Sequence, residues 1–247
     1  MMRAAYALFF SVVLTLSAGC ASDRQVIEQA EGAHNELEPA VMEDPELRGY
    51  MQATGQRIVD AARAMHAEHY GPDKHFDEDS EWMFSPEMKF HFVNSQTLNA
   101  FTTGGTHMYI YTELLQTCRT EDELVAVMAH EYAHIYGRHV QKGMDRQYWT
   151  LGGAVLAGVG GYALGGKEHG LEYGAGAATL AYAGGQFLGM GYTREDEAEA
   201  DELGFDFYVR AGWDPNRFGD FFQQLIDKGL DSESDTMILR NCRTARP

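Results

Sequence analysis

The sequence is poor in cysteine, in basic residues and in long apolar runs. Three cysteines in 247 residues are too few for the disulfide framework of a small secreted domain. Lysine and arginine number 19 against 37 aspartates and glutamates, and the net charge of −18 argues against nucleic acid as a partner, because phosphate binding needs clustered positive charge. The charged fraction of 23% and the hydrophobic fraction of 45% are those of an ordinary folded protein. We therefore expect one sizeable domain with a buried core.

The first twenty residues have the pattern of a secretion signal. Residues 1–3 give a positive start, and residues 4–16 form an apolar run that is too short for an ordinary membrane span. Small residues at 17–19 precede Cys20, which resembles the lipobox of bacterial lipoproteins. This resemblance implies a cleaved signal peptide over 1–19 and an acylated (palmitate-bearing) Cys20, and Ala21 is typical of an outer-membrane lipoprotein facing the periplasm. A plain signal peptide is the alternative.

The remaining chain predicts a mainly helical domain of the α+β class. Residues 20–45 are polar and acidic, and we interpret them as a tether with some helix. Apolar residues recur at helical spacing from 46 to 69, and further helices are predicted over 120–143, 193–210 and 216–228. Two β-rich runs, 88–93 and 106–111, could pair in one small antiparallel or mixed sheet. The domain is expected to cover 46–230 and to be followed by a divergent tail over 231–247.

The sequence leaves open the structure of a Gly-rich segment and the pairing of two cysteines. The Gly-rich segment 152–191 fits close-packed helices or a mobile cover over a site; a membrane hairpin is less favoured because glycine and alanine are weakly hydrophobic. If Cys20 is acylated, Cys118 and Cys242 remain in an oxidising compartment. There they form a disulfide or stay as two free thiols, since the sequence gives no distance between them.

The motif His130-Glu131-Tyr132-Ala133-His134 carries the clearest chemical signal. Two histidines four positions apart on a helix lie about 40° apart around its axis, so both imidazoles can reach one ion. Glu131 is turned by about 100° from His130, close enough to hold a water beside that ion. The preceding residues 124–129 are apolar, so the helix is expected to be buried, where unpaired His and Glu would be costly. The motif therefore predicts a metal site rather than spare surface histidines.

A catalytic zinc needs three protein ligands and one open position, so one ligand must come from elsewhere in the chain. Glu197 and Asp201 share a helix face at i and i+4. We expect Glu197 to complete a site for one Zn²⁺ per chain and Asp201 to orient a ligand histidine through its other N–H. The alternative is a solvated acidic face that also includes Glu195 and Glu199.

Residues 93–143 and 194–215 together resemble a known family. The matching residues are Asn94-Ser95, Asn99-Ala100-Phe101, Gly104-Gly105, Tyr109-Ile110-Tyr111, Asp122-Glu123-Leu124, the run from His130 to His139, the run from Arg194 to Asp201, Leu203-Gly204 and Ala211 to Pro215. They resemble the zinc metallopeptidase family of HtpX, the CAAX prenyl endopeptidases and the periplasmic proteases BepA and LoiP. The resemblance covers about residues 45–228.

The resemblance implies a zincin-like metalloprotease domain, gluzincin-like in its ligands. Zinc would be held by His130, His134 and Glu197, and Glu131 would be the catalytic base. The family pattern also implies an exposed edge strand that a peptide substrate can join through its backbone. The residues expected in that strand are Gly105, Thr106, His107, Met108, Tyr109, Ile110 and Tyr111.

We therefore expect a zinc metalloendopeptidase that hydrolyses misfolded or misassembled envelope proteins. Its partners would be polypeptide substrates, the membrane through acylated Cys20, and the envelope assembly machinery. A zinc-bound chaperone that holds chains with little proteolysis is the alternative, and a purely structural lipoprotein is a third reading. Family members usually carry a His-Pro element after the last helix, which is not found here, so no residue is assigned to stabilise the transition state. His139 is a candidate, although a structural role is favoured for it.

Overall fold

The computed structural model describes residues 22–71, 78–146 and 192–229. Of these, residues 23–140 and 192–229 belong to one compact unit. Several expectations fall on residues outside the described ranges: the signal peptide 1–19, Cys20, the Gly-rich segment 152–191, the tail 231–247 and Cys242. Among the described helices, none is both long and apolar enough to span a membrane.

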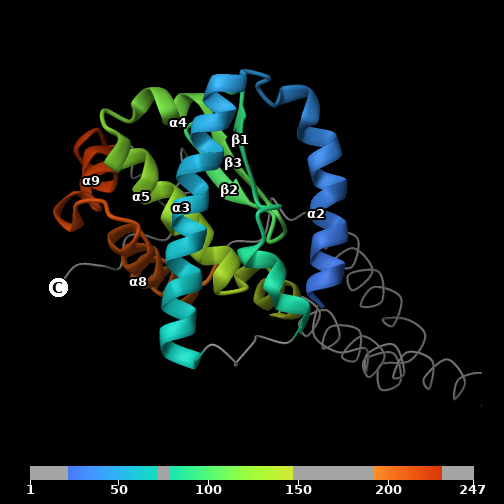
Figure 1. The fold of residues 1–247 in the computed structure, drawn as a ribbon. Coiled ribbons are helices and arrows are strands. Elements are labelled where there is room, and N and C mark those ends of the chain that lie inside the picture. Colours follow the sequence, from blue (N-terminus) through green and yellow to red (C-terminus); the bar gives the residue numbers. More distant parts are fainter. Residues whose placement is uncertain (1–21, 72–77, 147–191, 230–247) are drawn as a thin grey trace, which may run out of the picture. The chain divides into compact units, whose positions relative to one another are not determined.

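The mainly helical α+β class with a small mixed sheet is confirmed (Figure 1). In chain order the elements are α2 (Asp23–Leu37), η1 (Glu38–Ala40), α3 (Pro45–Tyr70), η2 (Glu78–Phe84), β1 (Lys89–Val93), β2 (Ala100–Thr102), β3 (His107–Tyr111), α4 (Thr112–Thr117), α5 (Glu121–Tyr136), α8 (Arg194–Arg210), η5 (Pro215–Arg217) and α9 (Asp220–Asp227). Helices α3 and α8 lie where the sequence predicts them. The helix expected over 216–228 is divided into η5 and α9.

The sheet has the strand order β1-β3-β2 among the described residues. Strand β3 pairs in parallel with β1 and antiparallel with β2, so it lies in the middle of the sheet. The expectation that residues 105–111 form an edge strand is therefore wrong. The reason is β2, a three-residue strand too short to show a pattern in the sequence, after which Gly104 takes a positive φ of 76°. In the described part of the chain, β2 is the edge strand on that side, and its three residues are buried.

The two faces of the sheet carry different side chains because successive residues of a strand point to opposite faces. One face is apolar and packs in the main core against α3 and α5, and its residues are Phe90, Phe92, Met108 and Ile110. The other face carries histidine and tyrosine side chains and is covered by α2, which Figure 1 shows beside the sheet. The sheet thus separates the main core from a smaller polar layer.

The segment expected to be a tether is mostly the helix α2, and it packs on the unit. Val26 and Ala30 are fully buried. The buried carboxylate of Asp23 accepts a hydrogen bond of 2.6 Å from Nη2 of Arg138, in the turn that follows α5. The folded unit therefore begins near residue 23 and not at residue 46.

Helix α5 is shorter than the predicted 120–143. It begins as expected after Thr120, whose hydroxyl accepts from the backbone N–H of Glu123, and it ends at Tyr136. Gly137 and Arg138 form a turn in which Arg138 has a positive φ of 56°, and helical residues resume at His139. This break turns the side chain of His139 back toward the end of α5.

Candidate metal centre

The site is built where α5 and α8 pack side by side. Gly204 allows the close approach, because a Cβ at this position would lie 3.0 Å from Cα and 3.0 Å from N of His130. Helix α8 begins with a capping box in which Thr193 and Asp196 each bond the other's backbone N–H. Glu197 consequently lies in the first turn of α8, where the helix dipole favours a negative charge.

Three potential metal ligands meet at this contact. Nε2 of His130 lies 3.1 Å from Nε2 of His134. One carboxylate oxygen of Glu197 is 3.4 Å from Nε2 of His130, and the other is 3.9 Å from Nε2 of His134. All three side chains are at least 94% buried. The structure thus brings together the three residues that the sequence predicts as metal ligands.

These separations fit a zinc ion. Ligand atoms arranged tetrahedrally around zinc at 2.0–2.1 Å are about 3.3 Å from one another. The three residues could therefore hold one ion with small movements of the side chains. The donor set of two imidazoles and one carboxylate is also the one that catalytic zinc sites use.

Asp201 lies beside the outer nitrogen of His130, as expected from its position one turn after Glu197. Its Oδ1 is 2.9 Å from Nδ1 of His130, a short contact in which the N–H is not aligned as a hydrogen bond. Burial by itself would lower the pKa of His130, but the carboxylates of Asp201 and Glu197 outweigh it and raise that pKa to about 10. A cation is therefore favoured at this position, whether it is a proton or a metal ion.

The nitrogen of His134 that points away from Glu197 contacts His139. The sequence favoured a structural role for His139 but did not indicate this partner. The two Nδ1 atoms are 2.8 Å apart, and Nε2 of His139 lies 3.2 Å from a carboxylate oxygen of Glu199. His139 is fully buried, and it reaches back because Gly137 has no side chain in its path. This geometry gives His139 a place behind a ligand, in agreement with the structural role favoured from the sequence. The sequence offered no sign that Glu199 would join it.

Glu131 lies in the same buried site. Burial raises the pKa of its carboxyl to about 8, with a further rise from Glu197 and an opposing effect of His130. The side chain is 5% exposed. A carboxyl group with a raised pKa in a closed site is typical of a group that takes up and returns a proton.

Tyr192 is the site residue that the sequence did not indicate. Its ring stacks on the imidazole of His134, with centroids 3.8 Å apart and an interplanar angle of 13°. Desolvation and the nearby Glu131 and Glu197 raise the pKa of its hydroxyl well above the ordinary value. No motif marks this position, because it depends on how the chain enters α8.

Cys118, at the end of α4, lies apart from these residues and carries a free thiol. Burial, and to a smaller extent Glu123, raises its pKa to about 12. Cys242 lies outside the described residues, so a disulfide between the two cysteines stays a prediction.

Comparisons with known proteins agree with this geometry. The family model described as Peptidase family M48 matches residues 76–239. The putative beta-barrel assembly-enhancing protease of Vibrio cholerae serotype O1 is 30% identical over 191 residues, which cover 76% of this chain and 34% of that protein. The beta-barrel assembly-enhancing protease of Escherichia coli (strain K12) is 26% identical over 201 residues, which cover 81% of this chain and 37% of that protein.

A third relative is shorter. The metalloprotease LoiP of Escherichia coli (strain K12) is 26% identical over 140 residues, which cover 56% of this chain and 52% of that protein. The chain thus spans about a third of the length of the two beta-barrel assembly-enhancing proteases and matches about half of LoiP.

Proposed function

The chain belongs to peptidase family M48, and on that premise we propose that it is a zinc-dependent metalloendopeptidase of the bacterial cell envelope. The observation that carries the proposal is the convergence of two imidazoles and a carboxylate in a buried site, together with a buried Glu131 that interacts electrostatically with His130 and Glu197. This arrangement supports a hydrolase more than a structural protein. Burying ionisable groups costs desolvation free energy unless they pair with one another or bind a metal ion.

Each residue of the site has a proposed role. His130, His134 and Glu197 would hold one zinc ion. Bound there, zinc would polarise the scissile carbonyl group and lower the pKa of water toward neutrality. Asp201 and His139 would fix the orientation of the two ligand imidazoles through their contacts with the outer nitrogens, as groups behind metal ligands do.

Glu131 would act as general base and then as general acid. Its carboxylate would accept a proton from the attacking water and pass that proton to the leaving amine. The raised pKa of Glu131, about 8 in the metal-free protein, suits both transfers near neutral pH. A neighbouring cation would lower this pKa and increase the fraction that is ready to accept a proton.

The proposed substrates are polypeptides that bind through their backbone. Since β3 is paired on both sides, the edge strand β2 would take the role first expected of residues 105–111. Strand β2 packs against α5, the helix that carries His130 and His134. An extended peptide added to β2 would therefore run beside the metal centre, and such pairing tolerates many side chains.

We place the protein in the envelope and its substrates among misfolded or misassembled envelope proteins. The names of two relatives connect them with beta-barrel assembly, which makes that machinery a candidate partner. The lipobox-like pattern before Cys20 supports attachment to the outer membrane through an acylated cysteine. Stable anchoring requires more than one acyl chain on that residue. Both points are proposals for this chain.

The test compares wild type, Glu131→Gln and Glu202→Gln in cleavage of casein, with zinc content measured for each. Glu202 is an exposed residue of α8 and serves as the matched control. We expect Glu131→Gln to keep its zinc and to lose turnover by about 10²–10⁴-fold, the usual contribution of a general base. Glu202→Gln should cleave like wild type, and a chelator should stop cleavage.

Two results would contradict the proposal. A Glu131→Gln variant that cleaves casein at the wild-type rate would remove Glu131 as base. Casein binding by the wild-type protein without any chelator-sensitive cleavage would instead favour the chaperone alternative.

A further inference from the structure

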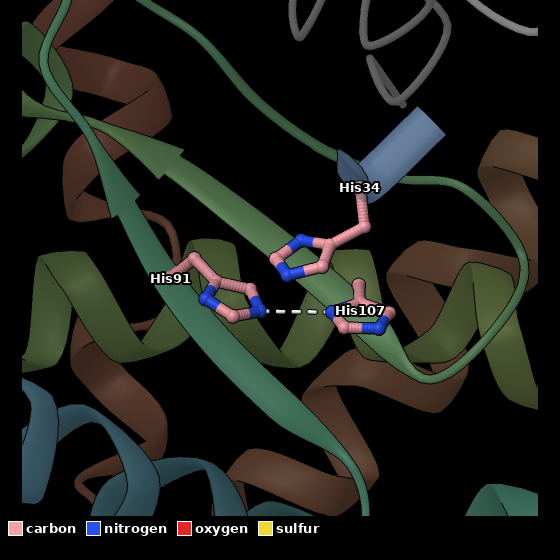
Figure 2. Close-up of side chains that lie close together, drawn as sticks. All are labelled: His34, His91 and His107. Carbon is pink, nitrogen blue, oxygen red and sulfur yellow. Dashed lines mark hydrogen bonds between the residues drawn. The ribbon is translucent and has the colours of Figure 1, made fainter. Parts of the chain in front are cut away.

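Three histidines meet at a second place, away from the metal centre. His34 comes from α2, His91 from β1 and His107 from β3. Figure 2 shows the three rings close together between the helix and the two strands. One ring nitrogen of each lies within 4.8 Å of those of the other two.

The strand register explains why two of the rings are neighbours. His91 is paired with Tyr109 and His107 with Lys89, so His91 and His107 are diagonal neighbours on the polar face of the sheet. Nε2 of His91 lies 2.9 Å from Nδ1 of His107. Their ring planes differ by only 15°, so these two nitrogens face each other nearly in the plane of both rings.

His34 completes the group from the helix above. Its ring stacks on that of His107 with centroids 4.1 Å apart and lies 4.8 Å from that of His91. The side chain is half-buried, and the torsion about its Cβ–Cγ bond is soft. To ligate an ion in the gap between His91 and His107, the His34 ring would have to rotate about that bond from its stacked position.

Outer hydrogen bonds hold two of the rings, while the inner nitrogens of His91 and His107 hydrogen-bond each other, a bond that a metal ion would replace. Nε2 of His107 lies 3.1 Å from Oε1 of Glu31, so the Nε2–H donates to the carboxylate and the lone pair of Nδ1 points inward. Nδ1 of His34 lies 3.0 Å from the hydroxyl of Tyr109. A carboxylate behind an imidazole is the usual arrangement of a metal-binding histidine.

The surroundings admit a cation. The three histidines line an open cavity of about 1130 Å³. Its charged wall contains four carboxylates, Glu31, Glu38, Glu43 and Glu87, against the two cations Arg48 and Lys89, so its formal charge is negative. Burial and the neighbouring rings lower the pKa of His91 to about 3, and burial lowers the pKa of His107, so both imidazoles are neutral, which is the form that binds metals.

We propose that His34, His91 and His107 form a second metal site, which takes a borderline transition-metal ion such as Zn²⁺ and is supported by Glu31. Three imidazoles with an open fourth position suit zinc, copper or nickel and not calcium or magnesium, which prefer oxygen ligands. Ligands about 3.3 Å apart are required around a tetrahedral zinc, so the 2.9 Å contact between His91 and His107 needs to open only slightly.

The site would fasten α2 to the sheet. His34 is the ligand that α2 supplies, and the other two belong to strands β1 and β3. Because an ion bound only by the folded protein stabilises it, loading this site should raise the unfolding temperature of the whole unit. The effect does not depend on hydrolysis at the first centre.

The test counts zinc in the full-length chain by mass spectrometry after dialysis against micromolar Zn²⁺. Wild type should hold two ions per chain, and His91→Ala and His34→Ala one each. His130→Ala, which alters the first centre, should also hold one, and the double variant His91→Ala/His130→Ala none. His69→Ala is the control, since this exposed histidine belongs to neither group, and it should keep two.

The design separates the two sites. If the first centre binds no zinc, His130→Ala changes nothing while His91→Ala still lowers the count, so the second site stands by itself. If folded His91→Ala and His34→Ala, verified by circular dichroism, both keep the wild-type count, the proposal is overturned and the rings form only a hydrogen-bonded stack.

A milder variant avoids loss of folding as an explanation. In the His130→Ala background, Glu31→Gln should weaken zinc binding by about 10- to 100-fold, the usual effect of losing a partner behind a metal ligand. Competition with a chromophoric chelator measures that affinity. In the same background, Zn²⁺ should raise the unfolding temperature, and His91→Ala should abolish the rise. An unchanged affinity in Glu31→Gln together with no thermal shift would refute the site.

Discussion

Gly204 of α8 lies directly against the backbone of His130 in α5, so that a Cβ added at 204 would be 3.0 Å from both Cα and N of His130. The distance between the two helices at the metal centre therefore depends on the absence of one methyl group. Glu197 is two turns earlier on α8, and the closeness of the helices is what brings its carboxylate to the imidazoles.

The first prediction concerns this contact. Gly204→Ala should push α8 away from α5, weaken zinc binding and destabilise the protein by about 1–3 kcal/mol, as overpacking of a core does. Gly49→Ala is the matched control, because a Cβ at this exposed helical position meets nothing within 4 Å. It should leave zinc binding unchanged and stabilise α3 by up to about 1 kcal/mol. Urea unfolding and zinc titration check both variants, and wild-type zinc affinity in Gly204→Ala would show that the contact is not needed.

The second prediction concerns the carboxylate behind His130. Asp201→Asn keeps the shape of the side chain but removes the charge that lies 2.9 Å from Nδ1 of His130. Zinc affinity should fall by about 10- to 100-fold with the fold retained. Glu202→Gln, an exposed neighbour on the same helix, should have no effect. Competition with a chelator gives both affinities, and equal values for the two variants would contradict a positioning role for Asp201.

The third prediction concerns His139. His139→Leu keeps a bulky buried side chain at this position but removes the nitrogen 2.8 Å from Nδ1 of His134. We expect zinc affinity to fall by about 10- to 100-fold. Glu199→Gln should have a smaller effect, because Glu199 is exposed and lies against the far nitrogen of His139. A larger loss of zinc affinity in Glu199→Gln than in His139→Leu would contradict the proposal that Glu199 acts on His134 through His139.

The fourth prediction is a pH dependence of the metal-free protein. Folding raises the pKa of Glu131 from 4.5 to about 8, so between these values the folded state binds more protons than the unfolded chain. The unfolding free energy contributed by Glu131 therefore falls as pH rises from 4.5 to 8 and levels off above.

Glu131→Gln removes this contribution. In the presence of chelator, the variant and wild type should have similar stability at pH 5, and the variant should be more stable at pH 8. A gain of about 1.4 kcal/mol corresponds to one pKa unit and is the least that we expect. Urea unfolding at three pH values measures the difference. A gap between the proteins that stays constant from pH 5 to pH 8 would show that Glu131 does not titrate as described.

Much of the metal centre could be predicted from local sequence. The spacing of His130 and His134 fixes their common helix face, and Asp201 follows Glu197 by one turn, so the two short patterns define most of the site. Tyr192 and Glu199 escaped prediction because neither belongs to a periodic pattern. The position of Tyr192 depends on the entry to α8, and that of Glu199 on a partner that becomes visible only after the turn at Arg138.

The strands show where local sequence is insufficient. The pattern of 106–111 identifies a strand, but whether a strand is central or at an edge depends on what pairs with it. Strand β2, with three residues, has no pattern of its own, and its pairing with β3 makes β2 the edge strand in place of β3. The same limit applied to α2: its polar composition allowed some helix in a tether but did not show that this helix packs on the unit and buries Val26 and Ala30.

The sequence by itself determined the chemistry of this protein, because the spacing of donors along a helix is a local property. Tertiary structure alone decided which distant groups meet. It placed α8 against α5 at Gly204, closed β2 onto β3, and gathered His34, His91 and His107 from three separate elements. Such contacts arise from the packing of whole elements around a shared core, and no stretch of sequence contains that information in isolation.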